Sequence, residues 1–177
     1  MAGGLSGGHG KKATRGCPCG YHGDPVHHCV CGPLDVERYR SRVSGPLLDR
    51  IDLHLEVPAV AYRDLVGGGP EEPSAAIRAR VERARAAQRD RFRRRPGVYA
   101  NAHMSAPDLR NHCPLGPAVE ALLRDAVNRL GLSARAYHRV LKIARTIADL
   151  EGAADLTTAH VSEAIQYRSL DRRRAAA

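Results

Sequence analysis

The sequence contains few aromatic residues: no Trp, one Phe and six Tyr in 177 residues. These aromatics are scattered along the chain, so it lacks the stacking platform of a sequence-reading RNA module. No apolar run approaches the length of about 18 residues that a membrane-spanning helix requires. The first 16 residues hold no apolar stretch of the kind found in secretory signals. We therefore expect neither export nor a membrane partner.

Lysine is scarce as well, at three Lys against 25 Arg, and the net charge is +9. Such Arg usage in an Ala- and Gly-rich chain is also typical of a GC-rich coding sequence, so charge alone does not establish a nucleic-acid partner. Five cysteines without a signal peptide indicate a reducing compartment. We expect a cytoplasmic protein, in which clustered thiols favour metal over disulfides.

The composition changes three times along the chain. Residues 1–16 are Gly-rich and aperiodic, and we expect a disordered tail. Residues 17–66 hold four cysteines and the one clear strand pattern. Residues 67–73, GGGPEEP, are typical of a linker. Residues 74–172 have the periodicity of helices throughout. The predicted fold is therefore mainly α, with one strand near its beginning.

The strand pattern lies just before the linker. Ile51, Leu53, Leu55 and Val57 alternate with polar residues, which predicts a strand with one buried face that ends at Pro58. A short helix carrying Val36, Tyr39 and Val43 is expected before it. Because one strand cannot form a stable sheet, residues 17–66 are expected to be the end of a larger α/β core.

Capping residues and apolar stripes predict five helices beyond the linker. They are expected from Ser74 to about Arg95, from Ser105 to near His112, over Val119–Leu130, from Ser133 to Gly152, and from Thr157 through Ile165. The stripe of the first helix is Ile77, Val81, Ala84, Gln88 and Phe92. In the last helix, Leu156 and Val161 are spaced as a hydrophobic staple.

The first candidate site is a pair of C-x-C motifs, Cys17-Pro-Cys19 and Cys29-Val-Cys31, separated by nine residues. Four thiolates can close around one tetrahedral Zn²⁺ in a structural site. Free thiols packed in a loop and disulfides are the alternatives, because C-x-C departs from the more usual C-x-x-C. Three histidines are substitute ligands: His22, His27 and His28. Cys113 stands alone and is expected to be a small buried side chain.

Three further candidate sites contain arginine: Arg50, Arg135 and the helix of residues 74–95. Arg50, at the mouth of the predicted strand, can reach a phosphate in a neighbouring subunit or pair locally with Asp49 or Asp52. Arg135 lies in the first turn of a helix, where free backbone N–H groups favour an anion such as a nucleotide phosphate; a solvated side chain is the alternative.

The helix of residues 74–95 holds nine arginines against two acids, a net charge of +7. Arg78, Arg85 and Arg89 are candidates for contacts to a nucleic-acid backbone, and a solvated outer face is the alternative. Gly7–Thr14 superficially resembles a phosphate loop but lacks the Gly and Ser or Thr that G-x-x-x-x-G-K-[ST] requires. We find no paired-carboxylate or Ser/His/Asp arrangement.

Four stretches resemble one family. CPCGYHGDPVHHCVCGPLDVERYRSRVSGPLLDRIDLHLEVPAV is similar to the middle of the magnesium-chelatase-related AAA+ ATPases of the ComM/YifB competence group. NAHMSAPDLRNHC, GLSARAYHRVLKIARTIADLEG and HVSEAIQYRSLDR resemble the helical lid of that family. The resemblance runs from Cys17 to about Arg172.

The resemblance implies an assembly and an activity. Full-length relatives build hexameric rings that bind ATP and Mg²⁺ between subunits, and they are related to the chelatase motor and to MCM-type helicases. ComM-like members act as DNA helicases that promote branch migration during transformation. By resemblance, Arg50 is the arginine finger that reaches the γ-phosphate of a neighbour, and Arg135 is the sensor-2 arginine of the lid. The four cysteines also match the family pattern, with the metal inferred.

The sequence departs from the family before Cys17. Relatives have Asn-Pro there, and this chain has Arg15-Gly16. The Walker A and Walker B segments are absent from these 177 residues. We expect a C-terminal fragment of such an ATPase, from a split gene, a frameshift or a misplaced start, that does not hydrolyse ATP alone. The alternatives are a non-enzymatic DNA-binding module and a non-functional gene fragment.

Overall fold

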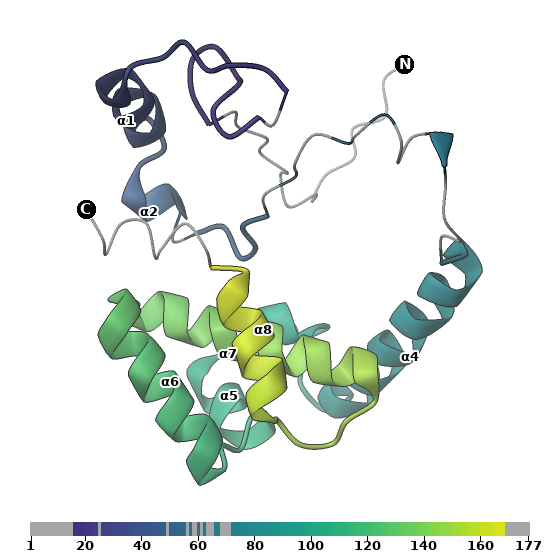
Figure 1. The fold of residues 1–177 in the computed structure, drawn as a ribbon. Coiled ribbons are helices and arrows are strands. Elements are labelled where there is room, and N and C mark those ends of the chain that lie inside the picture. The colour runs from purple at the N-terminus through teal and green to yellow at the C-terminus, as the bar shows by residue number, and fades with distance from the viewer. Residues whose placement is uncertain are drawn as a thin grey trace, which may run out of the picture. The chain divides into compact units, whose positions relative to one another are not determined.

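The structure is a computed structural model that describes residues 16–24, 26–48, 50–55, 57, 60, 62, 66, 67 and 72–168 (Figure 1). Its contacts group the chain into two compact units: Met1–Ser44 with Pro58–Val60, and Gly45–Val57 with Ala61–Ala177. Nearly all of the predicted disordered tail and most of the predicted linker lie outside the described residues. The division into domains that we drew from composition stays a prediction.

The first unit contains the cysteine loop and helix α1 (Pro33–Ser41). Pro33 at the first helical position and Asp35 in the first turn are residues that favour a helix start. Val36 is buried, and Nε of Arg40 donates a hydrogen bond of 3.1 Å to the carbonyl of Gly16. This bond ties the residue before the first C-x-C motif to the end of α1.

The second unit is helical, which confirms the mainly α fold. Its elements are α2 (Gly45–Leu48), α4 (Ser74–Phe92), the 3₁₀ turn η1 (Asn101–His103), α5 (Ala106–His112), α6 (Pro117–Leu130), α7 (Ala134–Glu151) and α8 (Thr158–Gln166). Figure 1 shows α5, α6 and α8 gathered around α7, with α4 running outward from this bundle.

Side-chain caps begin three of these helices where the sequence predicts them. The Ser105 amide donates to Oδ2 of Asp108 at 2.9 Å, and the Asp108 amide donates back to the Ser105 hydroxyl at 3.4 Å. The Ser133 hydroxyl accepts from the Ala136 amide at 3.1 Å. At α8, Thr157 forms a capping box in which His160 replaces the usual Glu or Gln, accepting from the Thr157 amide through Nδ1 at 3.1 Å.

The apolar stripes of the helices meet in one core. Val140, Ala144 and Ala148 of α7 are fully buried, and Leu123 of α6 and Val161 of α8 belong to the same core cluster. The helices α6 and α7 end in left-handed glycines, Gly131 (φ 59°) and Gly152 (φ 78°). Both the stripes and the stops of these helices follow the sequence prediction.

Helix α4 differs from its prediction at both ends. It begins at Ser74, but Pro73 is the N-cap and provides no side-chain bond, and it ends at Phe92 instead of Arg95. Only the second half of its stripe is buried, since Ile77 and Val81 are 41% and 42% exposed. The first half of α4 therefore extends beyond the bundle, where no described element covers its apolar face.

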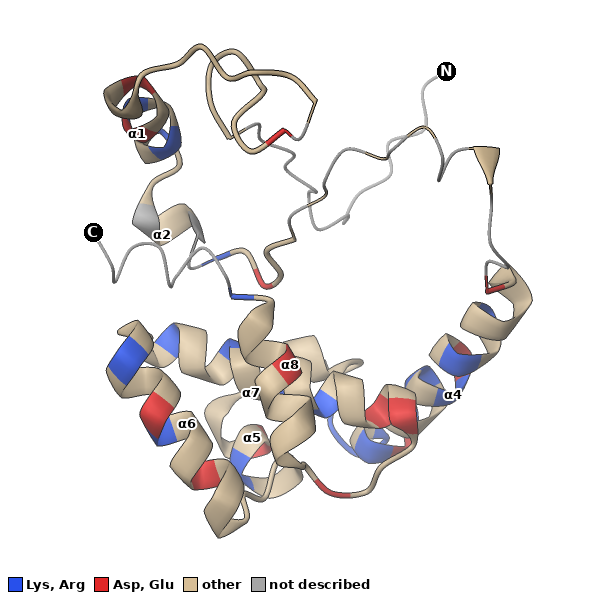
Figure 2. Cartoon of the chain, viewed as in Figure 1, with Lys and Arg blue, Asp and Glu red and all other residues tan. Residues whose placement is uncertain are grey.

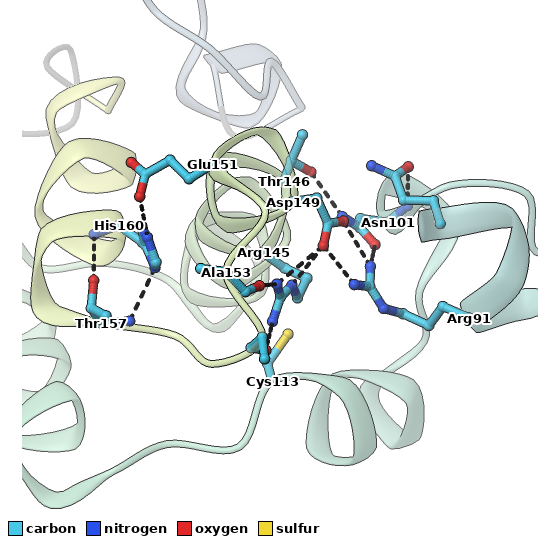
Figure 3. A network of polar contacts seen from close by, with 12 residues as sticks. Arg91, Asn101, Cys113, Arg145, Thr146, Asp149, Glu151, Ala153, Thr157 and His160 are labelled. Carbon is cyan, nitrogen blue, oxygen red and sulfur yellow. Dashed lines mark hydrogen bonds and ion pairs between the residues drawn. The ribbon is translucent and has the colours of Figure 1, made fainter. Parts of the chain in front are cut away.

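A buried polar network fixes the second half of α4 to α7 (Figure 3). Arg91 donates to both carboxylate oxygens of Asp149, at 2.7 and 2.5 Å. Asn101 donates to the same carboxylate at 2.8 Å, and Arg145 donates through Nε at 3.1 Å. Burial raises the pKa of Asp149, but the bonds from Arg91 and Asn101 outweigh it, so the pKa lies below its ordinary value. The charged Asp149 carboxylate of α7 thus links α7 to α4 and η1 by hydrogen bonds.

The predicted strand over residues 51–57 is wrong for the part that the structure describes, which is residues 51–55 and 57. These residues form no strand, and Leu53, Leu55 and Val57 are 48%, 67% and 87% exposed, whereas His54 is buried. A strand needs a paired neighbour, and the backbone here bonds instead to the end of α8: the His54 amide donates to the Tyr167 carbonyl at 2.7 Å.

Among the helices of the described residues, none has both the length and the apolar character needed to cross a bilayer. This agrees with the absence of long apolar runs in the sequence.

Candidate functional site

The four cysteines of the two C-x-C motifs form a compact sulfur cluster. The ligand atoms of Cys17, Cys19, Cys29 and Cys31 all lie within 4.8 Å of one another. Sulfur–sulfur distances are 3.3 Å for Cys17–Cys19, 3.7 Å for Cys17–Cys29 and 3.6 Å for Cys19–Cys29. In a tetrahedral zinc centre with Zn–S bonds of about 2.3 Å, the sulfurs stand about 3.8 Å apart. The spacing of these three sulfurs therefore fits a shared metal ion.

Tight turns bring the two motifs together. The Gly20 amide donates to the Cys17 carbonyl at 3.2 Å, and Gly20 and Gly23 have φ of 90° and 82°. Residues with a Cβ rarely adopt this left-handed region, so glycine fits both positions. Cys17 is fully buried and the other three thiols are half-buried. The loop buries little else, since Val26 and Val30 are 79% and 80% exposed.

The structure contains neither histidine ligands nor disulfides at this cluster. All five cysteines are free thiols, and the 3.3 Å between Cys17 and Cys19 is well above the disulfide length of about 2.05 Å. His22, His27 and His28 are exposed and lie outside the group of ligand atoms. His27 instead pairs with Asp24 at 3.3 Å and stacks on Tyr21.

The electrostatics of the cluster favour a cation. The backbone N–H of Tyr21 holds the pKa of the Cys19 thiol down at about 6. The backbone N–H of Cys19 also lowers the pKa of Cys31, yet the Cys19 side chain and burial together raise it to about 12. One thiolate thus resists the formation of the next, and a divalent cation among them would remove that repulsion.

Cys113 has a different setting. It is 3% exposed within the helical core, and burial raises the pKa of its thiol to about 11. A thiol of this kind is a packed apolar side chain and not a nucleophile. This agrees with what the sequence predicts for the lone cysteine.

Arg50 is the second residue after α2 and has an exposed side chain, and its amide donates to the Leu47 carbonyl at 3.0 Å. Among described residues, no carboxylate lies within ion-pair distance of its guanidinium. Asp52, one of the two local partners considered for it, is instead paired with Arg139 of α7. Asp49, the other, lies outside the described residues. Arg50 is thus presented outward at a turn.

Arg135 is the second residue of α7, immediately after the Ser133 cap, and it too is exposed. Within the described part of the chain, no carboxylate is paired with it. Arg135 thus belongs to the first turn of an 18-residue helix, where the backbone N–H groups have no helical partner. Their partial positive charge and the guanidinium both favour an anion there.

The residues after Arg50 are anchored to the helical bundle. Asp52 pairs with Arg139, which is one turn along α7 from Arg135. Nη1 of the fully buried Arg168 donates to the Ile51 carbonyl at 2.5 Å. The structure therefore holds the turn of Arg50 and the first turns of α7 in one unit. Sequence reasoning missed these anchors, because no local pattern reveals a contact between residues 117 positions apart.

The arginines of α4 divide into two groups. Arg91 is committed to Asp149, and Arg80 pairs with Glu72 at 2.8 Å. Arg78, Arg85 and Arg89, the residues singled out from the sequence, are exposed, and basic residues recur along α4 in Figure 2. The structure places these three on one helix.

Comparison with known proteins matches both units of the chain. Residues 71–168 match the family model described as "Magnesium chelatase, subunit ChlI C-terminal". The chain belongs to the magnesium chelatase-related family. Residues 12–65 match a second model, "Magnesium chelatase, subunit ChlI". The cysteine cluster and Arg50 lie in the second match, and Arg135 lies in the first.

Curated relatives place the chain with ComM and YifB. It is 39% identical over 146 residues to "Competence protein ComM" of Haemophilus influenzae, which covers 82% of this chain and 28% of that protein. It is 39% identical over 150 residues to "Uncharacterized protein YifB" of Escherichia coli, with the same coverage. An uncharacterized protein of Mycobacterium tuberculosis is 35% identical over 162 residues. The chain spans less than a third of the length of these relatives, and the resemblance seen in the sequence is confirmed.

Proposed function

We propose that this chain is the lid and the end of the core of an AAA+ ATPase subunit that assembles in a hexameric ring and acts on DNA. The proposal rests on one observation: two exposed arginines, Arg50 and Arg135, are held in one unit without an ion-pair partner among the described residues. An unpaired guanidinium held by its backbone is suited to receive a phosphate. Because the family resemblance implies ATP binding in full-length relatives, the phosphate in this proposal is that of ATP.

The two arginines have different roles in this proposal. Arg50 projects from the turn after α2 and stabilises the charge that develops on the γ-phosphate in a neighbouring subunit. Arg135, beside the N–H groups that open α7, contacts a phosphate from the lid. The 177 residues contain no phosphate-loop motif. The phosphate cradle and the acid that holds Mg²⁺ would therefore lie outside these 177 residues, which are not expected to hydrolyse ATP on their own.

We further propose that Cys17, Cys19, Cys29 and Cys31 hold one Zn²⁺. Four thiolates satisfy its tetrahedral preference completely, so the ion would stabilise the loop without taking part in chemistry. The sulfur spacing supports this assignment. A loop with so few buried apolar residues gains its order from the metal.

A hybrid protein tests the roles of the two arginines. Residues 17–168 of this chain would replace the matching part of Haemophilus influenzae ComM, and ATP hydrolysis would be measured. Arg50→Ala is expected to lower kcat by about 10³-fold or more, as for other arginine fingers. Arg135→Ala is expected to weaken ATP binding by about 10- to 100-fold, since it removes a charged hydrogen bond.

Arg124→Ala is the matched control, because Arg124 is exposed on α6 and lies away from both arginines in sequence. Its hydrolysis rate should equal that of the unmodified hybrid. Equal rates for Arg50→Ala and Arg124→Ala would contradict the role given to Arg50.

A non-enzymatic DNA-binding module is the second candidate function, and the arginines of α4 favour it. In that case DNA binding would depend on those arginines and would not respond to ATP.

A further inference from the structure

The C-terminal end of α4 forms one wall of a groove. Gly97 adopts φ of 82°, a left-handed conformation that turns the chain back after the helix, and the Val98 amide donates to the Arg95 carbonyl at 3.2 Å. The space between α4 and this returning loop has a volume of about 660 Å³. That volume lies in the range of about 300–1,000 Å³ typical of ligand sites.

Five of the nine residues that line this groove are arginines and none is acidic. They are Arg85 and Arg89, one turn apart on α4, and Arg93, Arg94 and Arg95 at its end. Arg95 also contacts Asp108 at 2.8 Å, and Arg93 contacts Asp90 at 3.5 Å. Among the described residues, no carboxylate lies within ion-pair distance of the other three. The groove therefore presents uncompensated positive charge.

The remaining lining is apolar and aromatic. Phe92 is buried in the groove wall, with Pro96 and Val98 beside it. Tyr99 lies at the groove with 72% of its surface exposed. Its amide donates to Nδ1 of His103 at 3.3 Å, and the His103 ring meets the Tyr99 ring edge-on. An exposed tyrosine steadied by its neighbour offers a flat face on which a base can stack.

The network around Asp149 fixes this end of α4. Arg91 points into the bundle and is bound at both nitrogens by Asp149, as Figure 3 shows. The buried Gln88 and Phe92 lie on the same side of the helix. Arg85 and Arg89 are therefore held outward by a clamped helix, which limits the entropy lost when they bind a ligand.

We propose that this groove binds single-stranded nucleic acid, with phosphates on Arg85, Arg89 and Arg94 and one base stacked on Tyr99. A phosphate alone would leave the apolar wall and Tyr99 unused. A duplex would bury its base faces in its own stack, so Tyr99 could not reach them. The inference rests on the DNA partnership proposed above and adds the surface and the form of the strand.

Fluorescence anisotropy with labelled oligothymidylate of about 20 nucleotides tests the groove. Arg85→Gln, Arg89→Gln and Arg94→Gln together are expected to weaken binding at least 10-fold and to reduce the salt slope by about 2, at about 0.7 per lost phosphate contact. The control replaces Arg110, Arg124 and Arg129, exposed arginines of α5 and α6, by Gln and removes the same charge. An equal loss of binding affinity in the two triple variants would overturn the assignment of binding to the groove.

Substitutions of Tyr99 distinguish the contribution of base stacking from that of charge. Tyr99→Ala is expected to weaken binding about 5- to 150-fold and Tyr99→Phe to leave it unchanged, because both rings stack. A duplex of the same length, or polyglutamate, that competes as well as the single strand would overturn the assignment. If the Arg85, Arg89 and Arg94 triple variant bound the oligonucleotide as well as the parent, the proposed DNA partnership would stand, and only its assignment to this groove would be refuted. No binding by the unmodified chain would refute both.

Discussion

Asp149→Ala is expected to lower the free energy of unfolding of the helical unit by about 3–5 kcal/mol. The Asp149 side chain is 1% exposed and accepts hydrogen bonds from Arg91, Arg145 and Asn101. Among the described residues, its removal would leave the 3%-exposed guanidinium of Arg145 with only the carbonyls of Ala153 and Ala154 as partners. A buried cation without its anion accounts for the size of the loss.

Two-state urea unfolding measures this change. Asp125→Ala is the control, because Asp125 is 64% exposed and meets Arg129 at 3.7 Å on the surface of α6. Exposed pairs contribute about 0–1 kcal/mol, so the control should unfold almost as the parent does. A loss of under about 1 kcal/mol for Asp149→Ala would show that the network is not buried in solution.

The same carboxylate predicts a dependence on pH. Its pKa in the folded protein lies below the ordinary value, so its contribution to stability is present above about pH 4 and is lost as the pH falls through the folded pKa. Asp149→Ala should therefore lose less stability than the parent on acidification, as followed by the urea midpoint at a series of pH values. Parallel curves would contradict this assignment.

The second large effect concerns the metal. Metal analysis should find one zinc ion per chain, and a strong chelator should remove the protection of residues 16–32 from hydrogen exchange. Binding of structural zinc supplies about 10–16 kcal/mol in small zinc-dependent peptides, and this loop has little apolar core to replace it. Residues 74–168 should keep their protection, because they belong to the other unit.

Comparing Cys19→Ser with Cys113→Ser tests whether metal binding depends on the cluster or on any cysteine of the chain. Cys19 is one of the four clustered ligands, whereas Cys113 lies in the helical core. The first should lose the metal and the second should retain it. With Co²⁺ in place of zinc, the visible spectrum of the parent should report tetrahedral thiolate coordination. Metal-free protein with a fully protected loop would contradict the metal centre.

Local patterns in the sequence predict the helices but not their contacts. Ser105, Ser133 and Thr157 cap helices as predicted, because a cap depends on residues only three positions apart. The end of α4 was predicted less well: the arginines after Phe92 favour a helix, but the helix ends at Phe92 and the Arg95 amide forms a turn by donating to the Phe92 carbonyl. The α4–α7 network joins residues 58 positions apart, which no periodicity encodes.

The strand was wrong for a related reason. The alternation of apolar and polar residues from Ile51 to Val57 indicates only that the segment has one apolar and one polar face. Such a segment forms a strand only when a second strand supplies hydrogen bonds. In the described residues the segment bonds to Tyr167 and Arg168 instead, and His54 takes the buried position. The cysteine cluster was predicted from spacing alone because its ligands lie within 15 residues of one another.

The central claim is that Arg50 acts on ATP held by a neighbour, and mixed rings test it most directly. One hybrid would carry Arg50→Ala, and the other would keep Arg50 but lose the phosphate-loop lysine in its ComM portion. Each alone should be inactive. Mixed, they should regain ATP hydrolysis, because an intact pocket of the first hybrid then faces an intact Arg50 of the second. A mixture that stays as inactive as its separate components would contradict the claim.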